Sequence, residues 1–271
     1  MGRIILVSFA DSKFRPTAER LRKEAENFGI FSSIYIPSER NFDKWYRRRY
    51  WFRLMQKGMG FWMWKSYIVK KYYDTLLDGD ILLYVDAGCV LNKNGINRFT
   101  EYIDLVNSSP SGILAFMSPA HIECECTKAD VLHYFGLNQD SEISKTGQLY
   151  AGAFFLRKNP VADDLVDNWY SFCHNQFGLL SDNPSTIPNG SHFKFHRYDQ
   201  SVFSILAKMK DATILSTSET YTTGDWELML CYPIQAKRLK EYNLKQKIIH
   251  RMKFPIRRIL DYLVRSGIIR F

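Results

Sequence analysis

Apolar and mixed stretches alternate along the chain and predict an α/β fold. Apolar runs rich in branched residues occupy 3–9 and 30–36, and residues 17–28 between them place apolar side chains at helical spacing. This strand–helix–strand opening is typical of a doubly wound sheet, in which helices connect parallel strands. We expect further strands at 80–85, 112–117, 147–159 (ending near Arg157), 212–215 and 227–230, and helices at 62–77, 96–106, 129–135, 162–177 and 200–209.

Charge divides the chain into two parts. Its 271 residues are 46% hydrophobic and 24% charged, as in a folded globular protein large enough to bury a sizeable core. Residues 237–271 contain eleven Lys or Arg and two acids, so this segment carries the whole net charge of +9. A tail of this kind is suited to an anionic surface. We therefore expect one α/β domain over 1–234 and a basic extension over 235–271.

The extension has the pattern of an amphipathic helix. Ile256, Ile259, Leu260 and Leu263 recur at helical spacing, with arginines on other faces. Such a helix can lie on an anionic membrane leaflet. It can equally dock on the domain with a solvated basic face, and the sequence leaves both readings open.

The sequence also argues against several other classes of protein. It has no run of roughly 18 apolar residues for a membrane span, and "MGRIILVSFADS" reads as a first core strand rather than an export signal. The five cysteines are an odd number and scattered, so we expect reduced thiols and a cytoplasmic location. His121, Cys124 and Cys126 lie close together, but a C-x-C pair without a second pair is a weak zinc signal.

A buried strand that ends on an acid is the clearest candidate site. In "DGDILLYVDAGC" the apolar run 81–85 leads directly into Asp86, followed by Ala87 and Gly88. Ligands of open α/β sheets bind at the carboxyl ends of strands, and the small residues leave room for a bulky group. A carboxylate there can hold Mg²⁺ or Mn²⁺ on a diphosphate, or it can cap the following turn.

Three other polar residues have two readings each. Lys65, in "FWMWKSYI", can extend from a core helix to solvent or can hold a phosphate as a point charge. Asp199 stands at the start of a predicted helix, where an acid is first of all a cap. Gln200, one residue further, gains less from capping and is more informative about a site.

Five motifs in order resemble one enzyme family. The N-terminal strand "ILVSF", "WKSYI", "DGDILLYVDAG", "GQLYAGAFFLRKN" and "HRYDQSVFSIL" resemble nucleotide-sugar glycosyltransferases of the GT-A fold, most of all bacterial relatives of glycogenin and of the lipopolysaccharide galactosyltransferases. The resemblance covers roughly residues 3–234. It implies a single Rossmann-like GT-A domain with a mixed, mainly parallel sheet.

The resemblance also implies roles for individual residues. Asp86 matches the first acid of the family's D-x-D metal motif, and Gly88 stands where the second acid belongs. A single carboxylate binds Mn²⁺ or Mg²⁺ weakly, so His196, Asp225 or Lys65 would have to complete the site or replace the metal. By the same resemblance, the uracil and ribose would contact Ser8, Phe9 and Ala10. The diphosphate would contact Lys65. The donor sugar would contact Asp199, Gln200 and Gly152.

The function implied by the resemblance is sugar transfer. The donor would be a UDP-sugar carrying a hexose such as galactose, and the acceptor would be a surface polysaccharide or glycolipid. The protein would be peripheral on the inner face of the membrane. The alternatives are a sugar-nucleotide pyrophosphorylase and a non-catalytic module for anionic surfaces. The former is disfavoured because "SFADSKFRP" has no glycine-rich loop.

The aromatic and basic segment 42–73 stands apart. Gly58 and Gly60 divide it, and its first part, "WYRRRYWFR", could bind single-stranded nucleic acid. Because residues 1–236 are neutral overall, we instead expect an ordered helix or lid near the donor site, with arginines for phosphate or an acidic glycan, and no nucleic acid partner.

Overall fold

A six-stranded mixed sheet is the centre of the molecule. The computed structural model describes residues 2–239, so the predicted helix around Ile256–Leu263 lies outside the described residues. The strand order is β2-β1-β3-β6-β5-β7, and β6 alone runs antiparallel to both of its neighbours. The expected mixed, mainly parallel α/β sheet is confirmed. The strands are β1 (Ile4–Val7), β2 (Ser33–Tyr35), β3 (Ile81–Val85), β5 (Ile113–Ile122), β6 (Gly147–Arg157) and β7 (Thr213–Ser216).

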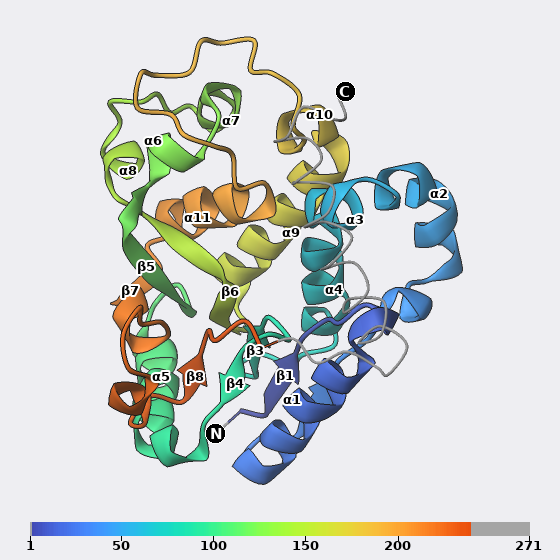
Figure 1. Ribbon diagram of the computed structural model, residues 1–271, viewed down its shortest axis with the longest axis vertical. Helices are drawn as coiled ribbons and strands as arrows, with labels where there is room; N and C mark the ends of the chain where they lie inside the picture. The colour runs from blue at the N-terminus through green and yellow to red at the C-terminus, as the bar shows by residue number, and fades with distance from the viewer. Residues whose placement is uncertain (1, 240–271) are drawn as a thin grey trace, which may run out of the picture.

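Helices cover both faces of this sheet (Figure 1). α1 (Arg15–Phe28) and α5 (Ile96–Ser108) pack on one face, and α4 (Met63–Tyr73), α9 (Pro160–Asn175) and α11 (Asp199–Met209) pack on the other. The remaining α-helices are α2 (Lys44–Leu54), α3 (Lys57–Phe61), α6 (Glu123–Cys126), α7 (Ala129–Tyr134), α8 (Glu142–Lys145) and α10 (Phe177–Leu180).

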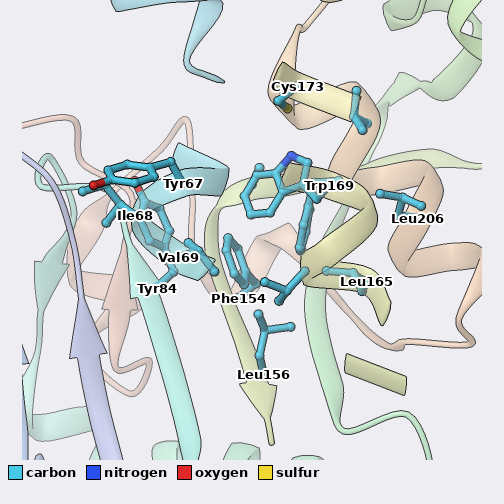
Figure 2. Close-up of a cluster of buried hydrophobic side chains, with 14 of the residues drawn as sticks. Tyr67, Ile68, Val69, Tyr84, Phe154, Leu156, Leu165, Trp169, Cys173 and Leu206 are labelled. Atoms are coloured by element: carbon cyan, nitrogen blue, oxygen red, sulfur yellow. The ribbon is translucent and has the colours of Figure 1, made fainter. Parts of the chain in front are cut away.

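Strand β3 shows why its sequence is continuously apolar. Leu82 and Tyr84 point into the core under α4 and α9, while Ile81, Leu83 and Val85 point into the core under α1 and α5. A strand buried on both faces needs apolar side chains at every position. Figure 2 shows the first of these cores, where Tyr84 of β3 and Phe154 of β6 lie beside Tyr67 of α4 and Trp169 of α9.

Local signals in the sequence set several helix ends. α1 has proline in its first turn and ends at Gly29, which adopts the left-handed conformation (φ 81°). α9 begins after Asn159, whose side chain accepts a hydrogen bond from the Ala162 amide at 2.8 Å. These residues stop and start the helices close to where the pattern predicts.

Other expectations need correction. Residues 227–230 do not form a strand, because Asp225 accepts a hydrogen bond from the Glu227 amide and Trp226–Met229 becomes a 3₁₀ turn. The helix expected over 62–77 covers only Met63–Tyr73. An additional two-stranded sheet joins β4 (Val90–Leu91) to β8 (Ile234–Gln235). The chain therefore continues as part of the fold through Gln235, and the Leu239 amide donates to the Gly88 carbonyl at 2.9 Å.

Within residues 2–239 no helix is both long enough and apolar enough to cross a bilayer.

Candidate active site

A buried lysine joins two carboxylates at one edge of the sheet. Lys65 lies in the first turn of α4 and is 5% exposed. Its Nζ is 3.1 Å from Asp86 Oδ1 and 3.6 Å from Asp199 Oδ2, and it donates a hydrogen bond to the Ala151 carbonyl at 3.0 Å. Residues predicted as separate motifs therefore form one cluster of charges.

Asp86 is the open member of this cluster. It follows β3 directly, and its amide donates to the carbonyl of Gly152 on β6 at 2.8 Å, so it lies at the carboxyl edge of the sheet. Tyr84, two residues earlier, donates its hydroxyl to Oδ1 at 3.0 Å. The side chain is 40% exposed, and within residues 2–239 no hydrogen bond engages Oδ2. That oxygen is available to a ligand.

Asp199 is the buried member. It is the first residue of α11, and the sequence did not decide between a helix cap and a site residue. Its carboxylate is only 6% exposed and faces Lys65. Burial raises its pKa to about 7; Asp86 adds to this shift and Lys65 opposes it. This carboxyl therefore exchanges its proton near neutral pH.

The charges of the cluster do not cancel. Burial favours a neutral Lys65, but the carboxylates of Asp86 and Asp199 outweigh it and raise the pKa of the ammonium group. One cation between two carboxylates leaves a net negative charge when both acids are ionised. A ligand that brings hydroxyl donors or positive charge is favoured there.

Gln200 is held beside the cluster by a buried polar chain. Its Oε1 accepts from the Ala151 amide at 3.4 Å, and its Nε2 donates to Gln148 Oε1 at 2.8 Å. Gln148 in turn donates to Glu123 at 2.9 Å, and Glu123 pairs with Lys208 at 2.7 Å. The sequence analysis missed Gln148, Glu123 and Lys208, because they come from three different elements and no local spacing links them.

The comparisons with known proteins return structures but no sequence relatives. No protein-family model and no curated protein matches the chain. Similar solved structures include a glycosyltransferase involved in glycosylating the major capsid of the virus PBCV-1, with 14% identity over 86% of this chain and 91% of its own, at a TM-score of 0.46.

Two further similar structures have comparable scores. The galactosyltransferase LgtC, in complex with donor and acceptor sugar analogs, has 11% identity over 83% of this chain and 78% of its own, with a TM-score of 0.45. Mouse xyloside xylosyltransferase 1 has 11% identity over 89% and 95%, with a TM-score of 0.39. Identities and TM-scores this low carry no argument about activity, which rests on the geometry of the site.

The residues expected to line the base and ribose are buried. Ser8, Phe9 and Ala10 follow β1 and are at most 7% exposed. Phe9 stacks on Phe42 (5.5 Å between ring centroids) and contacts the Trp64 ring (4.0 Å), so its ring is already covered by protein. The Ser8 hydroxyl is buried without a hydrogen-bond partner in the described part of the chain. Their role in base recognition stays a prediction.

The two glycines lie close to other parts of the protein. A Cβ at Gly152 would lie 2.1 Å from the Tyr150 ring. A Cβ at Gly88 would lie 3.2 Å from the backbone of Arg238. Both glycines therefore allow this close approach, and their contacts with a donor stay a prediction.

The divalent metal expected at Asp86 stays a prediction. No group of three or more His, Cys, Asp or Glu that could hold a metal occurs in residues 2–239. Asp225 caps a 3₁₀ turn, and the Nε2 atom of His196 is buried without a hydrogen-bond partner in the described residues. Asp86 offers one carboxylate with a free oxygen, and Mg²⁺ is usually held by one or two carboxylates together with waters and substrate phosphates.

Two arginines that the sequence analysis overlooked flank the site. Arg238 covers Gly88 with its backbone, and its charge acts on Tyr150 and on Arg197. Burial, followed by the charge of Arg238, lowers the pKa of Arg197. Within residues 2–239 neither guanidinium has a carboxylate partner, and that of Arg197 lies over the Phe195 ring (5.2 Å). Two neighbouring unpaired arginines are suited to an anion.

Proposed function

We propose that the protein is a glycosyltransferase that moves a hexose such as galactose from a UDP-sugar to a polysaccharide or glycolipid acceptor. The observation that carries this proposal is the cluster of Lys65, Asp86 and Asp199, with Gln200 beside it, at the carboxyl edge of the sheet. Edges of this kind bind ligands in open α/β sheets, and carboxylate and amide oxygens accept hydrogen bonds from sugar hydroxyls. The motif resemblance supports UDP as the nucleotide.

The proposed reaction replaces one bond at the anomeric carbon. The bond to the phosphate oxygen breaks, and its electron pair leaves with the nucleoside diphosphate. The acceptor oxygen forms the new bond, and its proton passes to a site carboxylate or to the departing phosphate. Asp86 and Asp199 stabilise positive character at the anomeric carbon, and Lys65 keeps the two carboxylates in place.

Negative charge on the leaving diphosphate also needs a partner. We assign this role to Arg197 and Arg238, which lack carboxylate partners within residues 2–239. Guanidinium groups bind phosphate oxygens in bidentate geometry. The sequence analysis had expected Mn²⁺ or Mg²⁺ at Asp86.

The acceptor and location are part of the same proposal. The basic extension, most of which lies outside the described residues, would hold the enzyme on the inner face of an anionic membrane, where lipid-linked acceptors are found. Truncation after Leu239, which keeps β8 and Arg238, would then lower binding to anionic vesicles, and equal binding of the truncated and full-length chains would refute this role.

Ligand binding and transfer test the function. Thermal shift with UDP, UDP-sugars and GDP-sugars, with and without Mn²⁺, should reveal stabilisation by a UDP-sugar; absence of any shift refutes nucleotide binding. Asp86→Ala should abolish sugar transfer and leave the melting temperature of the free protein nearly unchanged, because the side chain is partly exposed. Retained transfer would show that the reaction occurs elsewhere.

A further inference from the structure

The inner face of helix α2 (Lys44–Leu54) packs on the domain, whereas its outer face is exposed to solvent. Tyr46 and Tyr50 are buried; Tyr46 stacks on Tyr67 (3.8 Å between ring centroids) and bonds to His174 at 2.9 Å. In Figure 1, α2 lies at the periphery of the molecule, beyond α3 and α4. The inner face is sufficient to attach the helix to the domain.

The outer face carries large apolar side chains in solvent. The exposed fractions are 52% for Trp45, 60% for Trp51, 66% for Phe52 and 74% for Met55, the residue that follows the helix. Such residues contribute little to folding when they are exposed, and several of them together mark an interaction surface. Trp51 and Phe52 contact each other edge to face at 5.9 Å.

Positive charge lies among these apolar groups. Lys44, Arg47 and Arg48 occupy the same side of the helix as Trp51, at i, i+3, i+4 and i+7, and the four residues line one shallow depression. None of the three cations has a carboxylate partner in the part of the chain that the structure describes. The nearest acid in sequence, Asp43, is paired with Lys71 at 2.6 Å.

We propose that the outer face of α2 docks on an anionic phospholipid bilayer, with Trp45, Trp51, Phe52 and Met55 entering the headgroup region and Lys44, Arg47 and Arg48 binding lipid phosphates. Tryptophan is suited to the membrane–water interface, and cations near anionic lipids add electrostatic attraction. This surface consists of residues 44–55 and includes none of the basic extension, and the inference does not depend on the proposed reaction.

A bilayer suits this surface better than a nucleic acid. Single-stranded nucleic acids need a groove that follows several nucleotides and aromatic faces on which bases can stack. Here one short helix presents a shallow depression, and its neighbouring rings Trp51 and Phe52 meet edge to face. A peripheral helix with mixed apolar and cationic side chains instead suits the broad, charged surface of an anionic bilayer.

The test uses the full chain, so that the basic extension is the same in every variant. Co-sedimentation with vesicles of phosphatidylcholine and phosphatidylglycerol should show binding by the wild type and weak binding to phosphatidylcholine alone. Arg47→Gln with Arg48→Gln should weaken partitioning about 30-fold at low salt. Trp51→Ser with Phe52→Ser should weaken it about tenfold or more, and this loss should persist at high salt.

The matched control is Arg22→Gln with Lys23→Gln on α1, which removes two exposed, adjacent cations from another helix. It should bind vesicles nearly as the wild type does. Melting temperatures identify any variant that is misfolded, and the apolar and charge variants serve as independent tests. Wild-type partitioning of both α2 variants would overturn the proposal. So would a wild type that binds single-stranded RNA but not the anionic vesicles.

Discussion

The ammonium group of Lys65 lies 3.1 Å from the carboxylate of Asp86, although one belongs to a helix and the other to the end of a strand. Lys65 is buried, whereas the Asp86 side chain is 40% exposed. Lys65 therefore contacts the Asp86 carboxylate from the buried side and leaves Oδ2 free for a ligand. A charge held in this way needs little rearrangement when a ligand arrives.

Replacing Lys65 should destabilise the protein, because its two carboxylate partners lose their counter-charge. Lys65→Met keeps the length of the side chain but leaves Asp199 and part of Asp86 without their counter-charge. We expect the free energy of unfolding to fall by about 3–5 kcal/mol, measured by urea denaturation at neutral pH. Sugar transfer should also be lost.

A triple variant provides the control. Adding Asp86→Asn and Asp199→Asn to Lys65→Met removes all three charges, so most of the lost stability should return while transfer stays absent. A triple variant that is no more stable than Lys65→Met would show that packing, rather than charge, explains the loss.

Stability should depend on pH through Asp199. Its pKa rises from 3.8 to about 7 on folding, so between these values the folded protein binds more protons than the unfolded chain. The free energy of unfolding should therefore decrease as pH rises from about 4 to about 7. The pKa of Lys65 is raised from 10.5, so its contribution is lost only at much higher pH.

Asp199→Asn removes this titration. Urea denaturation across the same range should show that the difference in unfolding free energy between the variant and the wild type changes with pH, and that the wild type becomes relatively weaker towards about pH 7. Parallel curves for the two proteins would contradict the raised pKa of the buried carboxyl.

Some of this site could be predicted and some could not. Asp86 was evident because an apolar strand that ends on an acid is a local pattern, and Gln200 because it lies where capping explains little. The pairing of Lys65 with Asp199 depends on how α4 and α11 pack on β6, which no spacing in the sequence reveals. The chain from Gln200 to Lys208 through Gln148 and Glu123 was missed for the same reason.

Errors in the fold also have physical reasons. Residues 227–230 are mostly apolar, but a turn capped by Asp225 forms there, and no strand of the described sheets pairs with them. Gly58 and Gly60 correctly indicated a break. They gave no sign that Met59, Phe61 and Trp62 also adopt positive φ, so that residues 58–62 form one left-handed turn just before Lys65.

This left-handed turn can be tested at Gly58. Its φ is 60°, and a Cβ there would lie 2.6 Å from the Trp62 ring, which itself stacks on Tyr198 (5.5 Å). Gly58→Ala should therefore lower the free energy of unfolding by more than the roughly 1–2 kcal/mol expected of a left-handed residue alone. Gly136→Ala measures that backbone contribution, because φ there is 72° and nothing lies within 4 Å. Equal losses in the two variants would mean that Trp62 does not occupy this position.

The last prediction concerns Arg197 and Arg238, to which we assign the charge of the diphosphate. Calorimetric titration with UDP should show binding that persists in EDTA. Arg197→Ala and Arg238→Ala should each weaken it about tenfold or more, the range for a lost charge-assisted hydrogen bond. At φ 55°, alanine carries the same backbone strain as Arg238, so that variant changes the side chain alone. Arg22→Ala on α1 controls for net charge and should bind UDP as the wild type does. Wild-type binding that disappears in EDTA, together with unchanged affinity in both arginine variants, would assign the diphosphate charge to a metal instead.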